Sequence, residues 1–121
     1  MKISVIIPCY NEHETIEQIV DKVIDEKNYN KEIIIIDDFS TDGTREILKN
    51  KIKHKVDKII LNEKNYGKGY SVRKGINNAE GNVILIQDAD LEYDPSDYKK
   101  LISPIEKNGR VIFLLPTPKV S

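Results

Sequence analysis

Several features that would place this chain in a specialised class of protein are missing from its sequence. Cys9 is the only cysteine, so an internal disulfide is excluded and a reducing compartment is compatible with the sequence. The net charge of −1 argues against a protein that binds nucleic acid or an anionic membrane through bulk charge. No apolar run approaches the roughly 20 residues of a membrane-spanning helix. An expected strand begins almost at Met1, which leaves no room for a signal peptide. We therefore expect a cytoplasmic protein.

The order of apolar segments predicts the fold. The 121 residues suit a single domain (1–121), and no Gly/Ser linker, repeat or low-complexity tract divides them. Apolar runs alternate with segments in which apolar residues recur every three or four positions, as strands alternate with amphipathic helices. The expected strands are 2–7 (ended by Pro8), 32–36, 56–61, 83–86 and 110–115; the expected helices are 13–26, 43–53, one from the 65–69 loop to about 79, and one beginning at 94–96. This pattern predicts an α/β fold with three layers, α/β/α, and a mostly parallel sheet covered on both faces.

A pair of aspartates follows the expected strand 83–86. Asp88 and Asp90 lie at positions i and i+2 of an extended segment, so their carboxylates turn the same way. Two like charges held together favour a cation, and hard oxygen ligands suit Mg²⁺ or Mn²⁺. The sequence therefore predicts a divalent metal site, although Asp is also common in turns that end strands.

Other polar residues should reach the same edge of the sheet, because ligands bind beyond the carboxyl ends of parallel strands where strand order reverses. The adjacent carboxylates of Asp37 and Asp38 repel each other and need hydrogen-bond donors, which a ribose hydroxyl or a base N–H would supply. Tyr10 either stacks on a base or covers the strand end. Asn11 and Glu12 either contact a ligand or begin a helix.

A glycine-containing loop, 65–69 (NYGKG), precedes an expected helix. Its backbone N–H groups could approach a phosphate at the helix N-terminus, and Lys68 and Arg73 would balance the charge of a diphosphate. The alternative is a glycine turn with solvated lysines. Together, these features favour a nucleoside diphosphate bound with a divalent cation.

Four segments in this order resemble family-2 glycosyltransferases of the GT-A fold, a Rossmann-like nucleotide-diphospho-sugar transferase fold. They are 5–12 (VIIPCYNE), 35–44 (IIDDFSTDGT), 65–69 (NYGKG) and 87–95 (QDADLEYDP). The last segment looks most like the dolichol- or polyprenyl-phosphate mannosyltransferase branch. The resemblance spans about 2–107.

The resemblance implies a GDP- or UDP-sugar donor, and transfer of the sugar with inversion to a lipid phosphate or saccharide acceptor. It implies that Pro8, Tyr10, Glu12 and Asp38 contact the nucleotide, that Ala89 lies against the nucleotide sugar, and that Asp88 and Asp90, assisted by Glu92, hold the metal. With the residues argued above, the predicted donor-binding set is Pro8, Tyr10, Asn11, Glu12, Asp37, Asp38, Lys68, Gln87, Asp88, Ala89 and Asp90.

Two departures from the family pattern matter. Phe39 stands where the family usually has Gly, and the family carries its acceptor half and catalytic base beyond the point where this sequence ends. We therefore expect a donor-binding half that lacks the base and transfers sugar inefficiently. Peripheral contact with the cytoplasmic face of a membrane stays open, as does self-association through the sheet edge near 111–115.

Three other functions compete with this interpretation. One is a non-catalytic nucleotide-binding remnant of a glycosyltransferase. A receiver-type signalling module would have an acid pair after the first strand, whereas here the pairs follow the second and fourth. A nucleotidyltransferase would normally have a Gly-rich loop after the first strand, where this sequence has Pro8-Cys9-Tyr10.

Overall fold

A five-stranded parallel sheet organises the part of the chain that the computed structural model describes, residues 2–89 and 111–114. Along the chain the elements are β1 (Lys2–Cys9), α1 (Ile16–Asp25), β2 (Asn30–Asp37), α2 (Thr44–Ile47), the π-helical turn η1 (Leu48–Ile52), β3 (Lys58–Leu61), α3 (Lys68–Asn77), β4 (Val83–Ile86) and β5 (Val111–Leu114). The strand order is β3-β2-β1-β4-β5, and every neighbouring pair is parallel. The predicted α/β fold is confirmed.

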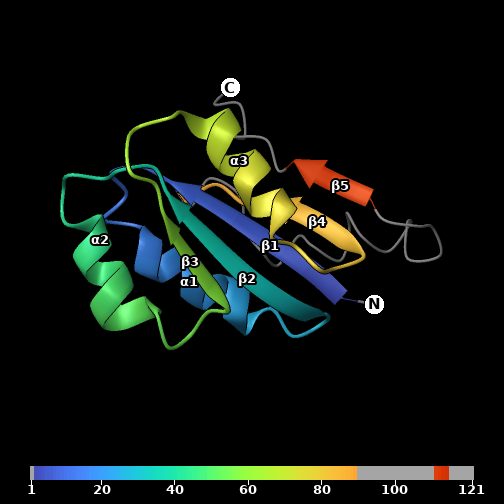
Figure 1. The fold of residues 1–121 in the computed structure, drawn as a ribbon. Helices are drawn as coiled ribbons and strands as arrows, with labels where there is room; N and C mark the ends of the chain where they lie inside the picture. The colour runs from blue at the N-terminus through green and yellow to red at the C-terminus, as the bar shows by residue number, and fades with distance from the viewer. Residues whose placement is uncertain (1, 90–110, 115–121) are drawn as a thin grey trace, which may run out of the picture.

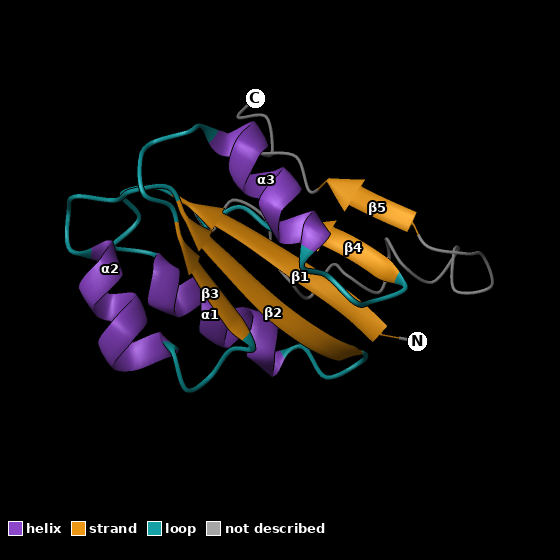
Figure 2. Ribbon diagram, viewed as in Figure 1, coloured by secondary structure: helices purple, strands orange, loops and turns teal. Residues whose placement is uncertain are grey.

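Helices cover both faces of the sheet (Figures 1 and 2). The side chains of a strand alternate between the two faces, so one strand contributes to two cores. Ile3, Val5 and Ile7 of β1 pack in the core with α1 and η1, while Ile6 packs on the other face with α3. The predicted three-layer arrangement is therefore present.

Strand order reverses beside β1. From β1 the sheet grows through β2 and β3 in one direction, and the chain then crosses back so that β4 pairs with the other side of β1. The carboxyl ends of β1 and β4 thus flank the crevice in which such sheets bind ligands.

The end predicted for the first strand was wrong, because Pro8 lies inside β1 and pairs with Ile36. Backbone groups of successive strand residues point alternately to the two neighbouring strands. The carbonyl of Ile6 accepts a bond from Gln87 N–H on the β4 side, so Pro8 also faces that side, beyond the last residue of β4. No N–H is needed there, and proline is tolerated.

Other boundaries also differ from prediction, and three of them have a clear cause. The first helix begins at Ile16 instead of His13, because the N–H groups of Thr15 and Ile16 both bond the carbonyl of Glu12 in a turn. The predicted helix 43–53 begins at 44, since Gly43 has a left-handed φ of 101°, and it continues as a π-helical turn. The third strand begins at Lys58 instead of Val56.

Asp57 explains the late start of β3. Its carboxylate accepts the N–H of Ile33 at 2.7 Å, which places a side chain where a backbone ladder bond would continue. The strand predicted at 110–115 is confirmed as β5, and the helix predicted from 94–96 lies outside the described residues. Within the described ranges, none of the helices has the length and apolar character needed to cross a bilayer.

Candidate functional site

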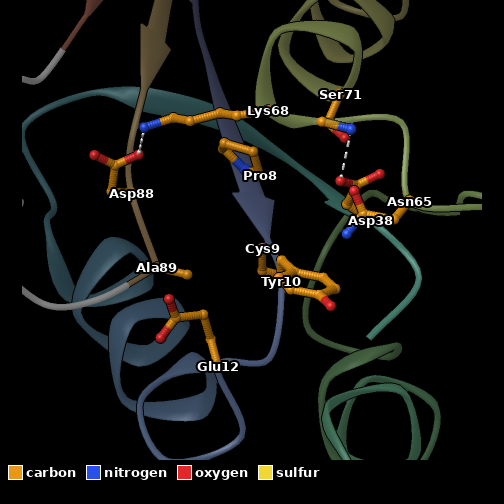
Figure 3. A pocket seen from close by; sticks show the side chains of 11 residues that line it. Pro8, Cys9, Tyr10, Glu12, Asp38, Asn65, Lys68, Ser71, Asp88 and Ala89 are labelled. Carbon is orange, nitrogen blue, oxygen red and sulfur yellow. Dashed lines mark hydrogen bonds and ion pairs between the residues drawn. The ribbon is translucent and has the colours of Figure 1, made fainter. Parts of the chain in front are cut away.

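A cavity of about 470 Å³ opens at the carboxyl ends of β1 and β4, where strand order reverses (Figure 3). Its lining comes from the end of β1 and the loop that follows it (Pro8, Cys9, Tyr10, Glu12), the residue after β2 (Asp38), the start of α3 (Asn65, Gly67, Lys68, Ser71) and the residues after β4 (Asp88, Ala89). The volume lies in the range of about 300–1,000 Å³ of small-molecule sites. The structure thus brings together the loops that the sequence places at one edge.

Asp38 holds the glycine-containing loop in place. Its Oδ1 accepts hydrogen bonds from Tyr66 N–H (2.8 Å) and Asn62 Nδ2 (3.0 Å), and its Oδ2 accepts the N–H of Gly67 (2.9 Å). A carboxylate oxygen has two acceptor sites, so one site on Oδ2 is not used by these bonds.

Lys68 links the start of α3 to the loop after β4. Its side chain extends from α3 across Pro8 to Asp88, and its Nζ lies 2.5 Å from Asp88 Oδ1 (Figure 3). The lysine side chain is 61% exposed and the aspartate 13%, so the cation can move while the carboxylate is held. One cation and one anion therefore meet where a diphosphate and a metal are predicted.

Tyr10 and Ala89 also line the cavity. The ring of Tyr10 is 46% exposed, which leaves a face of it available for stacking. The hydroxyl of Thr15 donates to the carbonyl of Ala89 at 2.5 Å and lies 3.2 Å from Glu12 Oε2. These contacts fasten the end of β4 to the turn before α1.

Asp37 is placed differently from its neighbour, because it does not line the cavity. Its side chain is fully buried on the side of α2, where Oδ2 accepts Arg45 Nε (2.7 Å) and Ser40 N–H (2.9 Å) and Oδ1 accepts the Ser40 hydroxyl (2.5 Å). Asp37 therefore supports the loop after β2 from outside the cavity lining, and its contact with a nucleotide stays a prediction.

Asn11 and Gln87 also lie outside the cavity lining. Asn11 has a left-handed φ of 53°, its N–H donates to Ser40 Oγ (2.9 Å), and its Oδ1 accepts Thr41 N–H (2.8 Å). Gln87 is fully buried, and its Nε2 lies 3.3 Å from the carbonyl of Asp88. Both residues position neighbouring loops of the site.

The predicted metal ligands are described only in part. Asp88 lines the cavity, while Asp90 and Glu92 lie outside the described residues. Within residues 2–89, no group of three or more His, Cys, Asp or Glu side chains is arranged to hold a metal ion. The carboxylates that line the cavity, those of Glu12, Asp38 and Asp88, provide the oxygen ligands that Mg²⁺ and Mn²⁺ prefer.

Sequence reasoning missed a polar pair behind Asp38. Asn62 is 1% exposed, and its Nδ2 donates to Asp38 Oδ1 and to Ser71 Oγ, each at 3.0 Å. Asn62 Oδ1 is buried and has no hydrogen-bond partner among the residues that the structure describes. Asn62 is the first residue after β3, and this position is the signal that could have identified it. The position of Ser71 in the site depends on where α3 packs, which the sequence does not give.

Two titratable groups near the cavity have shifted pKa values. Burial, and then the carboxylate of Asp37, raise the pKa of the Cys9 thiol well above its usual range, so it stays protonated at neutral pH. The hydrogen bond of His13 Nδ1 to Asp42 Oδ2 (2.7 Å) raises the pKa of His13. Because the folded-state pKa is raised, this contact stabilises the fold below about pH 6.5 and weakens as the pH rises through the raised value.

Phe39 has backbone φ of 67°, the left-handed region that favours glycine. Its ring is 43% exposed, and the Arg45 guanidinium carbon lies 5.1 Å from the ring centroid. The predicted departure from the family pattern therefore falls at a position whose backbone suits glycine.

We expect Phe39→Gly to be more stable than Phe39→Ala by about 1 kcal/mol, because a left-handed alanine costs about 1–2 kcal/mol and glycine relieves this. Both variants lose the Arg45 contact equally. Chemical denaturation would measure the difference. At the exposed helical position Lys49 the order should reverse, with alanine the more stable by about 1 kcal/mol. Alanine more stable than glycine at both positions would contradict the strain at Phe39.

Comparison with known proteins places this geometry in a family. The model of glycosyl transferase family 2 matches residues 4–121. The chain belongs to this family. It is 39% identical over 112 residues to a dolichol-phosphate mannosyltransferase of Pyrococcus furiosus, an alignment that covers 90% of this chain and 31% of the relative.

Two solved structures of similar proteins contain nucleotide sugars. S. aureus TarS 1-349 in complex with UDP-GlcNAc has a TM-score of 0.72 at 28% identity, over 88% of this chain and 32% of that one. The mannosyltransferase PcManGT from Pyrobaculum calidifontis, in complex with GDP-Man and Mn²⁺, has a TM-score of 0.68 at 27% identity, over 78% of this chain and 29% of that one.

These likenesses confirm the predicted GT-A fold, and membership of the family sets aside the receiver module and the nucleotidyltransferase. The chain spans about a third of the length of the curated relatives it matches.

Proposed function

We propose that this chain is the donor-binding part of an inverting glycosyltransferase, and that its cavity binds the nucleoside diphosphate of a GDP- or UDP-sugar. The observation that carries the proposal is the composition of one cavity at the point where strand order reverses. It combines an exposed aromatic ring, a carboxylate beside a helix N-terminus, and a lysine paired with an aspartate, from Tyr10, Asp38, Lys68 and Asp88.

The nucleoside would lie between Tyr10 and the start of α3. Tyr10 offers a ring face for stacking on a base. Asp38 Oδ2 keeps one acceptor site for a ribose hydroxyl or a base N–H, and Ser71 adds a hydroxyl to the same wall. The loop that Asp38 fixes would thereby set the position of the nucleoside.

The diphosphate would lie at the N-terminus of α3. The first N–H groups of a helix have no intrahelical acceptor, and the α3 terminus at Gly67 and Lys68 lines the cavity. Lys68 Nζ would exchange Asp88 for phosphate oxygen. Asp88 and Asp90, with Glu92, would then hold Mg²⁺ or Mn²⁺, an ion that supplies Lewis-acid stabilisation of the departing diphosphate.

The acceptor class follows from the relatives. The Pyrococcus relative is named for dolichol phosphate, so a polyprenyl-type lipid phosphate is the first acceptor to test, and a saccharide is the second. The catalytic base stays unassigned.

Asp88→Asn and Asp90→Ala test the metal assignment. In isothermal titration of GDP or UDP with Mn²⁺, each variant should bind at least about tenfold more weakly than the parent chain, because one charged oxygen ligand is lost. When EDTA removes the metal, Asp90→Ala should bind the nucleotide as tightly as the parent chain does. Asp88→Asn should bind it equally or more tightly, because Lys68 is released from its ion pair with Asp88 and can contact phosphate.

Asp21→Asn, an equal charge change on α1, is the matched control and should leave the affinity unchanged. Undiminished Mn²⁺-dependent affinity in both variants would refute the metal site. No binding of either nucleotide by the parent chain would refute the proposed function.

A further inference from the structure

The outer side of α3 and the loop before it carry a stacked aromatic pair, of which Tyr66 is exposed and Tyr70 half-buried. The rings of Tyr66 and Tyr70 stack with centroids 4.3 Å apart at an angle of 29°, and Lys74 Nζ lies 5.5 Å from the Tyr70 ring. Tyr66 is 43% exposed. α3 covers one face of the sheet, and Figures 1 and 2 show it at the front of the molecule. Tyr70 and Lys74 lie four residues apart in α3 and share one side of the helix, and Tyr66 stacks on Tyr70 from the loop before it.

The same segment is strongly basic. Residues 63–74 contain Lys64, Lys68, Arg73 and Lys74 and one acid, Glu63, so the segment has a charge of +3 in a chain of net charge −1. The rest of the chain therefore has a charge of −4. Lys64 and Arg73 are exposed. The surface made by Lys64, Tyr66, Tyr70, Arg73 and Lys74 is called the α3 surface below.

We propose that the α3 surface docks on an anionic lipid bilayer. Tyrosines combine an apolar ring with a polar hydroxyl and favour the membrane–water interface, where they lie at the level of the headgroups. Lysine and arginine beside them are attracted to the negative surface potential of anionic lipids. The combination of two stacked tyrosines, one of them exposed, with basic side chains suits this partner better than a partner recognised by charge alone.

The place of the α3 surface relative to the cavity supports this partner. Asn65, Gly67 and Lys68 line the cavity and belong to the same segment as the α3 surface. Docking would therefore bring the mouth of the cavity toward the lipid headgroups. This part of the inference depends on the proposed function, in which a lipid phosphate is the acceptor.

A second basic stretch provides a matched comparison. Residues 49–58 contain five lysines and one aspartate, yet have no aromatic residue. Lys55 pairs with Asp21 at 3.1 Å, and Lys58 Nζ donates to the carbonyl of Asn78 at 2.9 Å. Lys49 and Lys53 line a separate groove beside β3. If charge alone directed docking, this stretch would bind lipid at least as well as the α3 surface.

Vesicle co-sedimentation distinguishes the two surfaces. The 121-residue chain is mixed with phosphatidylcholine vesicles that contain or lack phosphatidylglycerol. We expect binding only to the anionic vesicles, with a strong decrease at high salt.

The double variant Lys64→Glu/Lys74→Glu should reduce the partition coefficient at least about tenfold, and Tyr66→Ser should reduce it several-fold at unchanged charge. Lys49→Glu/Lys53→Glu, an equal charge change, should bind within about twofold of the parent chain.

Three results would overturn the proposal: no binding to anionic vesicles, equal binding to neutral vesicles, or loss of binding only in Lys49→Glu/Lys53→Glu. Thermal melts of each variant show whether it is folded. Nucleotide titration without vesicles separates this inference from the proposed function, because neither Lys64 nor Lys74 lines the cavity. A chain that binds nucleotide but not vesicles contradicts only the lipid surface, and one that binds vesicles but not nucleotide contradicts only the proposed function.

Discussion

Asp38→Asn is expected to weaken binding of GDP or UDP at least about tenfold and to lower the free energy of unfolding by about 2–4 kcal/mol. The carboxylate accepts bonds from the N–H groups of Tyr66 and Gly67 and from the amide of Asn62. An asparagine has one acceptor oxygen, so its NH₂ group would face at least one of these donors. Each stranded, buried donor costs about 1–3 kcal/mol. The loop before α3 would then leave the position in which it lines the cavity.

Isothermal titration and chemical denaturation measure the two effects separately. Asp21→Asn serves as the control, because that carboxylate is half exposed and pairs with Lys55 on the surface, so both quantities should stay within error of the parent chain. An Asp38→Asn chain with unchanged affinity and unchanged stability would contradict the role assigned to Asp38.

Asp37→Ala should lower the free energy of unfolding by about 3–4 kcal/mol, the largest loss of stability that we expect from a single substitution. The carboxylate is fully buried and neutralises Arg45, whose side chain is only 21% exposed. Its removal strands that cation together with the N–H and hydroxyl of Ser40. Breaking a buried ion pair on one side costs about 3–5 kcal/mol, and the partial exposure of Arg45 reduces this figure.

Equilibrium unfolding in urea would measure the loss in Asp37→Ala. Asp21→Ala breaks an exposed ion pair by the same substitution and should cost less than about 1 kcal/mol. A loss below about 1 kcal/mol in Asp37→Ala as well would show that the buried network is not a main support of the loop after β2.

The contrast between Asp37 and Asp38 shows what the sequence could predict and where it stopped. A buried strand followed by two acids was enough to place both residues at the functional edge. Because side chains alternate along a strand, Asp37 and Asp38 point to opposite faces of the sheet. Asp37 lies on the same face as Ile35, and Asp38 lies on the same face as Ile36. Which of these faces borders the cavity depends on where α3 packs, and this is a tertiary property that strand periodicity does not contain.

The polar groups behind the cavity illustrate the same limit. Tyr10 and Asp88 could be found because each closely follows a strand of clear apolar character. Ser71 lies inside a helix, where a small polar residue gives no local signal, and it reaches the cavity only because the chain crosses back from β3 to β4 over the sheet. Pro8 gave a misleading signal, since its tolerance inside β1 depends on β4 ending at Ile86.

The central claim, that the cavity binds a nucleoside diphosphate, is tested most directly by mapping the bound nucleotide with amide chemical shifts. GDP and UDP would each be added, with Mg²⁺, to the isotopically labelled chain. The account predicts that the largest shift changes fall on the amides of Tyr10, Gly67, Lys68 and Ala89, which belong to three separate segments around one cavity. Absence of shift changes with both nucleotides, or changes confined to the groove beside β3 at residues 49–58, would contradict it.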